Sequence, residues 1–155
     1  MIQRKIHNSE DKLMKYLAKH HGQEFLYYLD SLEKEDNKVQ VKLPCKKIKK
    51  EIPTEIITPN FKNLLMDFTY EMEDCSITHY EHYSGNLNPG NLIHAGRYAI
   101  EKHEETGKPV NTIIVSTGNP EKSPREAWIG KVNKFTPIRI IFLKEYNGDK
   151  RLKKC

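Results

Sequence analysis

Two carboxylates in the middle of the chain have the types and the spacing of a metal site. Asp67 and Glu81 lie in the two arms of residues 64–84, LLMDFTYEMEDCSITHYEHYS, whose alternating pattern predicts a β-hairpin. The turn is expected within residues 73–75. If all three residues form the loop, Asp67 lies directly opposite Glu81, whereas a two-residue turn makes the two acids diagonal neighbours.

Two like charges opposed across a ladder are destabilising unless a cation bridges them or one of them is protonated. Oxygen ligands of this kind suit Mg²⁺ or Mn²⁺, so the pair predicts a site for one of these ions. The alternative is that both acids face solvent at a sheet edge and repel each other weakly. The same alternation places His79, Glu81 and Tyr83 on one face of the second arm, and Tyr80 and His82 on the other.

Length and composition predict a single soluble domain. The chain has 155 residues, of which 37% are hydrophobic and 30% charged, so it is long enough to bury a core without staples. We expect a leader at residues 1–8, a domain at 9–146 and a basic tail at 147–155. No run of about 18 apolar residues and no signal-peptide pattern is present, which predicts a cytoplasmic protein with no membrane partner.

The charge distribution is compatible with a polyanionic partner. The net charge is +5, and lysines including Lys46 and Lys47 crowd the segment that precedes the hairpin. Runs of this kind are usually solvated faces, so the cluster alone is weak evidence for nucleic acid. Beside a metal site it would hold phosphates near the carboxylates.

The elements around the hairpin predict a mixed sheet with helices on its faces. A helix pair is expected up to residue 32, with Gly22 as the left-handed residue that ends the first helix. A strand at residues 38–43 and an uncertain edge strand within 45–58 follow. After the hairpin we expect a helix from Pro89 to Gly107, a central strand at 111–117, and strands at 127–132 and 138–143. The helix from Pro89 can connect parallel strands.

These elements and their residues resemble the PD-(D/E)XK nuclease superfamily and, within it, the recombination-promoting nuclease and putative-transposase family. The segments that carry the resemblance are EDKLMKYLAKHHGQEFLYYL, EIPTEI, MDFTYEMEDCSITHYEHYS and GRYAIEKHEETGKPVNTIIVSTGN, and the resemblance as a whole covers roughly residues 9 to 145. The resemblance implies an α/β, restriction-endonuclease-like fold with an αβββαβ core. It also implies a Mg²⁺- or Mn²⁺-dependent endonuclease that acts on DNA.

Carried over by residue, Asp67 takes the place of the strand aspartate of the superfamily and Glu81 that of the motif acid. Tyr83 falls where the superfamily has lysine and this family often has glutamine, and a neutral phenol can only donate or accept a hydrogen bond. The backbone carbonyl of His82 would be a further metal ligand. Asp11 is the expected helical acid, a role for which Glu10 and Glu24 compete.

Arg97, on the helix after the hairpin, is a candidate phosphate clamp, although an arginine on a helix is more often a surface residue. Two other functions compete with the nuclease. One is a catalytically inactive nuclease-fold protein that binds nucleic acid or a protein, which the tyrosine at position 83 favours. The other is an assembly module that acts through its sheet edge, and a homodimer is one form that such a module could take.

Overall fold

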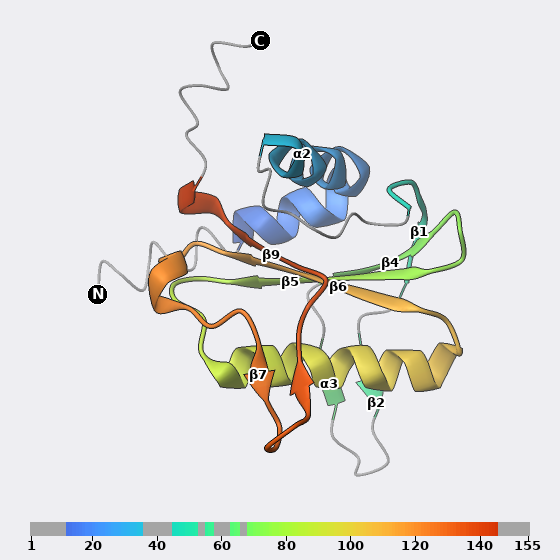
Figure 1. Cartoon of the computed structure of the whole chain (residues 1–155). Coiled ribbons are helices and arrows are strands. Elements are labelled where there is room, and N and C mark those ends of the chain that lie inside the picture. The colour runs from blue at the N-terminus through green and yellow to red at the C-terminus, as the bar shows by residue number, and fades with distance from the viewer. Residues whose placement is uncertain (1–11, 36–44, 53–54, 58–62, 66–67, 146–155) are drawn as a thin grey trace.

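A five-stranded mixed β-sheet separates two helical layers in this protein (Figure 1). The computed structural model describes residues 12–35, 45–52, 55–57, 63–65 and 68–145. The helix at residues 12–20 and α2 (Gly22–Glu35) cover one face of the sheet, and α3 (Pro89–Thr106) covers the other. No helix among the described residues is long and apolar enough to cross a membrane. The expected class, a mixed sheet with helices on both faces, is confirmed.

The strand order in the main sheet is β1, β4, β5, β6, β9, so β4, β5 and β6 are its inner strands, and α3 packs on β6. β1 and β4 are antiparallel to their neighbours, whereas β5, β6 and β9 run parallel. The five strands are β1 (Ile48–Glu51), β4 (Phe68–Met72), β5 (Ile77–Tyr83), β6 (Val110–Ser116) and β9 (Arg139–Phe142). As expected, α3 is the crossover between parallel strands.

Two short hairpins and two single turns complete the fold. The hairpins pair β2 (Glu55–Ile57) with β3 (Asn63–Leu65), and β7 (Ala127–Trp128) with β8 (Lys134–Phe135). The turns are the 3₁₀ helices η1 (Pro120–Lys122) and η2 (Leu143–Glu145). The expected first arm of the central hairpin is therefore divided, because Leu65 ends a strand of another sheet while Phe68 begins β4. The strand expected at residues 38–43 lies outside the described residues.

The central hairpin has the register of a three-residue turn. Phe68 lies opposite Tyr80 and Thr69 lies opposite His79, and the residue that closes the turn, Cys75, has a positive φ of 65°. This is the register in which the sequence predicts Asp67 to face Glu81. Asp67 itself lies outside the described residues.

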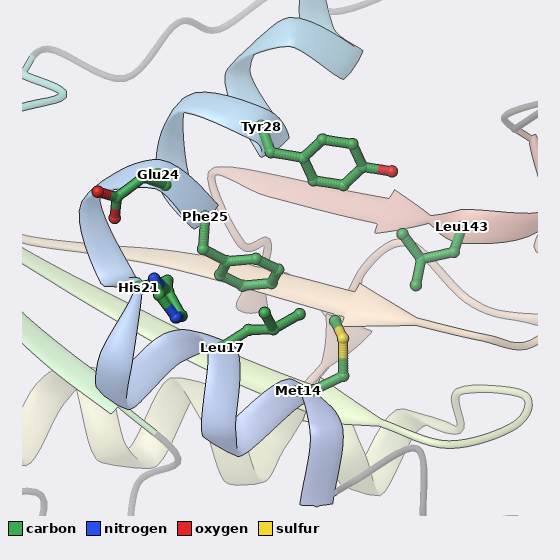
Figure 2. A pocket seen from close by; sticks show the side chains of 7 residues that line it. All are labelled: Met14, Leu17, His21, Glu24, Phe25, Tyr28 and Leu143. Atoms are coloured by element: carbon green, nitrogen blue, oxygen red, sulfur yellow. The ribbon is translucent and has the colours of Figure 1, made fainter. Parts of the chain in front are cut away.

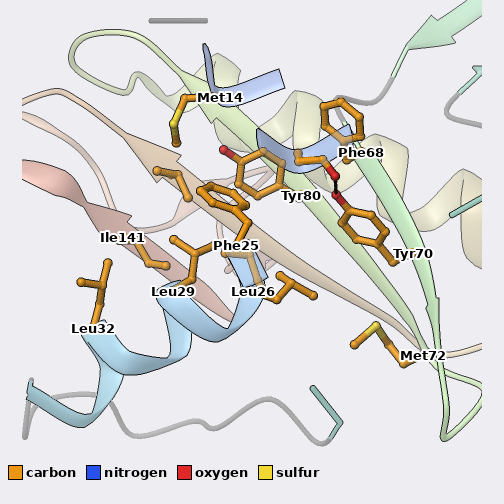
Figure 3. Packing of buried hydrophobic residues seen from close by; sticks show 13 residues of the cluster. Met14, Phe25, Leu26, Leu29, Leu32, Phe68, Tyr70, Met72, Tyr80 and Ile141 are labelled. Carbon is orange, nitrogen blue, oxygen red and sulfur yellow. Dashed lines mark hydrogen bonds between the residues drawn. The ribbon is translucent and has the colours of Figure 1, made fainter. Parts of the chain in front are cut away.

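The larger core lies between the sheet and the first two helices (Figure 3). The ring of Tyr80 on β5 meets the ring of Phe25 on α2 edge-on, with centroids 5.3 Å apart. The hydroxyl of Tyr70 on β4 donates to the carbonyl of Ala18 at 2.5 Å, which ties the first helix to the sheet. Tyr80 therefore packs under a helix, as the alternation predicts.

The expected role of Gly22 is wrong. Gly22 is the first residue of α2 rather than a left-handed stop, and it has no positive φ. A Cβ at this position would lie 3.1 Å from the hydroxyl oxygen of Tyr70. The glycine therefore permits the close approach of α2 to β4, which is a tertiary reason that the local sequence does not contain.

The boundaries of α3 agree with the sequence. Asn88 caps the helix through a reciprocal pair of hydrogen bonds with Asn91, and Pro89 occupies its first turn. Gly107, with φ of 67°, ends it in the left-handed conformation. A second core cluster lies under this helix; its buried members are Leu87, Leu92, Ala95, Ile114, Ala127 and Phe142.

Lysines surround Glu71 at the turn end of the hairpin. Lys108 donates to Oε1 of Glu71 at 2.8 Å, and the ammonium of Lys50 lies 3.3 Å from Oε2. The hydrogen bond from Lys108, aided by Lys50, lowers the pKa of Glu71, and the same bond raises the pKa of Lys108. The pair thus joins β4 to the loop after α3.

The buried tyrosine gives a first test of this packing. Tyr80 is 1% exposed, so Tyr80→Ala removes a buried ring and is expected to lower the free energy of unfolding by about 3–5 kcal/mol. Urea denaturation measures the change. Tyr27→Ala, at an exposed position of α2, is the matched control and should stay within about 0.5 kcal/mol of the wild type. Equal stability of the two variants would contradict the packing.

The lysine cluster gives a pH test. Because the folded pKa of Glu71 lies below its ordinary value of 4.5, the stabilisation is complete above that pH and is lost as the pH falls through the folded pKa. Because the pKa of Lys108 is raised, its stabilisation is complete below its ordinary value of 10.5 and is lost at higher pH. Denaturation of the wild type should therefore show a larger acid-induced loss of stability than Glu71→Gln. Parallel pH profiles would refute the assignment.

Candidate functional site

The side chains of His79 and Glu81 form a buried polar pair on the α3 side of β5. Nε2 of His79 lies 2.8 Å from Oε1 of Glu81. His79 is 0% exposed and Glu81 is 5% exposed. When the Glu81 carboxylate is ionised it can only accept hydrogen bonds, and the imidazole then donates through Nε2. Two residues apart on one strand, the two side chains share a face, as the sequence predicts.

Neighbouring elements hold the imidazole of His79 in place. Nδ1 is hydrogen-bonded to the hydroxyl of Thr112 on β6 at 3.3 Å. The ring of Tyr98 on α3 meets the imidazole edge-on, with centroids 5.9 Å apart, and the Tyr98 hydroxyl is hydrogen-bonded to Nε2 of His94. The orientation of Glu81 is therefore set by contacts from β5, β6 and α3.

The hydroxyl of Tyr83 is directed to the helix. It donates to the carbonyl of Asn91 in the first turn of α3 at 3.2 Å, and the half-buried ring packs against the second core cluster. These contacts fasten the end of β5 to the start of α3. A role for the hydroxyl in chemistry stays a prediction.

The other predicted metal ligands are divided between described and undescribed residues. The side chain of His82 is buried, and the alternation of β5 places it on the face opposite Glu81. The predicted ligand there is the backbone carbonyl, and this stays a prediction. Asp67 and Asp11 lie outside the described residues. The described part of β4 begins at Phe68, which lies opposite Tyr80. The described residues of β4 therefore end before the position that would pair with Glu81.

The predicted phosphate-binding residues do not gather around Glu81. Lys46 forms an ion pair with Asp30 of α2 at 2.5 Å, and Lys47 is exposed beside the turn, where its carbonyl accepts from Glu73. Both lysines thus precede β1 at the far end of the hairpin. Arg97 is exposed on the outer side of α3, while Glu81 lies beneath that helix.

The carboxylate of Glu81 is a suitable type of ligand for a hard divalent ion, because Mg²⁺ and Mn²⁺ prefer oxygen ligands. Among the described residues, no group of three or more His, Cys, Asp or Glu side chains could hold a metal ion. A metal site at Glu81 would therefore need ligands beyond these residues, and Asp67 is the predicted one.

The sequence reading missed two buried polar residues. His79 is fully buried, and its spacing of two from Glu81 on a strand is the signal from which the pair can be inferred. Lys102 is among the most buried side chains of α3, and its ammonium lies 3.3 Å from Oε1 of Glu105. Only the packing of α3 on the sheet shows that both residues are buried.

The opposite side of the sheet carries a separate apolar groove of about 540 Å³. Figure 2 shows Met14, Leu17, Phe25 and Leu143 directed toward one another, with the carboxylate of Glu24 directed away. The sheet separates this groove from Glu81, so the groove does not belong to the polar site.

The chain matches no protein-family model, no curated protein and no solved structure. The function proposed for it therefore depends on its own residues and on their geometry.

Proposed function

We propose that this protein is a metal-dependent endonuclease that hydrolyses the phosphodiester backbone of DNA, with a restriction-endonuclease-like fold. The observation that carries the proposal is a carboxylate on an inner strand, held by a fully buried histidine, in the hairpin register in which the sequence predicts Asp67 to lie directly opposite it. Apart from the β2–β3 hairpin, which forms a separate sheet, the chain order α2, β1, β4, β5, α3, β6 is the one that an αβββαβ core would have, and this supports the proposal.

Phosphodiester hydrolysis requires an attacking water in line with the leaving oxygen and compensation of charge on the phosphate. A divalent ion bound to Asp67 and Glu81 would activate the water and neutralise that charge. The chain itself keeps the Glu81 carboxylate in one orientation through His79, which in turn is held by Thr112. The phenol of Tyr83 would have to release its hydrogen bond to Asn91 before it could orient a phosphate oxygen, and it adds no positive charge.

A nuclease-fold protein that binds nucleic acid without cleaving it is the second candidate. The hydrogen bond from the Tyr83 hydroxyl to the carbonyl of Asn91 favours it, because a hydroxyl engaged with a helix is poorly placed to act on substrate. The low exposure of Glu81 also favours this function.

The first experiment measures nicking of supercoiled plasmid by the purified protein with Mg²⁺, Mn²⁺ or EDTA. We expect metal-dependent nicking that falls by at least about 100-fold in Glu81→Gln and in Asp67→Asn, since each substitution removes a proposed metal ligand. Glu73→Gln, which removes the same charge from the exposed turn, is the matched control and should remain active. As a readout independent of cleavage, Mn²⁺ should raise the melting temperature of the wild type but not of Glu81→Gln.

Nicking that persists in both acid variants would overturn the assigned site. If the wild type cuts nothing while Tyr83→Lys gains metal-dependent nicking, the second candidate is correct and the missing lysine is the cause.

The contact between His79 and Glu81 predicts a positioning role for the histidine. His79→Asn should raise the Mn²⁺ concentration needed for half-maximal nicking by about 10- to 100-fold, because partners that orient a metal ligand contribute that much to metal affinity. A purely structural role would lower the melting temperature and leave this concentration unchanged. The melting curve and the metal titration together separate the two roles.

A further inference from the structure

A short hairpin, residues 127–135, projects from the α3 side of the protein. Ala127 pairs with Phe135 and Trp128 with Lys134, and the amide of Ile129 donates to the carbonyl of Asn133 at 2.8 Å. Figure 1 shows the hairpin beside α3, with its tip extending beyond the helix and away from the sheet.

The base of this hairpin is fixed to α3. Ala127 is buried in the second core cluster, and the ring of Phe135 lies so close to Gly96 that a Cβ there would be 2.7 Å from a ring carbon. Tyr83 packs against the same cluster. The hairpin is therefore rooted in the cluster that also contains the end of β5, two residues beyond Glu81.

The tip of the hairpin is apolar and exposed. Trp128 is 54% exposed, Ile129 is 64% exposed and Val132 is 82% exposed. Single exposed apolar residues are ordinary, but three on one projecting turn form a patch of the kind that marks a binding surface. These side chains contribute little to the core, so the fold does not account for them.

Positive charge accompanies the apolar tip. The ammonium of Lys134 lies 5.3 Å from the centroid of the Trp128 ring and 2.8 Å from Oε2 of Glu126. Lys131, in the turn itself, is exposed and has no acidic partner among the described residues. An apolar tip beside unpaired positive charge complements a ligand that combines anionic groups with flat apolar faces.

We propose that this hairpin binds single-stranded nucleic acid, with Trp128 stacking on an unpaired base and Lys131 contacting a phosphate. Base stacking on an aromatic ring tolerates any sequence, and unpaired bases offer their faces without a cost of unstacking. Trp128, Ile129 and Val132 provide apolar contacts and few hydrogen-bond donors, which suits base faces rather than base edges. This inference rests on the proposed nuclease function, because that function is the reason to choose nucleic acid over other anionic partners.

Binding of a fluorescent oligothymidylate in EDTA, which prevents cleavage, tests the hairpin without testing the nuclease. We expect Trp128→Ala to weaken binding by about 10-fold and Lys131→Gln to reduce the slope of log affinity against log salt by about 0.7. Tyr27→Ala, an exposed aromatic on the other side of the sheet, is the matched control and should bind like the wild type. Unchanged melting temperatures would verify that the variants fold.

Equal affinity of Trp128→Ala, Val132→Ser and the wild type would overturn the proposal. Tighter binding to a duplex of the same length would overturn the assignment to unpaired bases. Binding to vesicles of phosphatidylcholine and phosphatidylserine that depends on Trp128, without binding to the oligonucleotide, would overturn it in favour of a membrane surface. Hairpin-dependent binding by a protein that cuts no plasmid would support the hairpin while refuting the nuclease, so the two failures are distinguishable.

Discussion

The burial of a polar pair on an inner strand is the constraint on which the rest of this structure depends. Residues 77–82 of β5 are all buried, and the strand presents Tyr80 to α2 while it presents His79 and Glu81 to the layer of α3. Buried polar groups must find partners, and a buried charge without one is very costly. Thr112 of β6 supplies one of these partners, so the pairing of β6 with β5 and the position of α3 over both are coupled to the chemistry of two side chains.

Stability alone does not explain why the pair is present. A buried pair of this kind is often replaceable by well-packed apolar residues at little or no cost, whereas loss of one partner costs about 3–5 kcal/mol. The α2-facing side of the same hairpin carries Phe68, Tyr70 and Tyr80 beside the buried His82, so these strands also accommodate large aromatic side chains. Glu71 differs, because its partners are the half-exposed or exposed lysines at the edge of the sheet. The physical argument for a functional role therefore applies to Glu81 and not to Glu71.

The features that depended on local sequence were predicted, and those that depended on distant contacts were not. The turn expected within residues 73–75 left two registers open, of which the structure has the three-residue one, and strict alternation predicted the two faces of β5. Pro89 and Gly107 marked the ends of α3. Gly22 was misinterpreted because its reason is the ring of Tyr70, on another element. β8 was missed because a strand of two residues has no measurable period, and its place is fixed by Phe135 on Gly96. Glu81 was identified from the sequence as a candidate residue, but its partnership with a buried His79 is visible only with the packed helix.

The sheet divides the surface of this protein into two sides with different chemistry. Glu81, Tyr83, Arg97 and the 127–135 hairpin all belong to the α3 side, whereas the apolar groove of Met14 and Leu143 lies on the side of α2. Lys46 is paired with Asp30 of α2, and it precedes a strand whose first residue, Ile48, pairs with Met72 beside the turn. Glu81 lies four residues beyond the start of β5, which is about 13 Å along a strand. A nucleic-acid strand bound at both the hairpin tip and the neighbourhood of Glu81 would therefore lie along the α3 side. To contact Lys46 and Lys47 as well, the strand would have to extend to the turn end of the central hairpin.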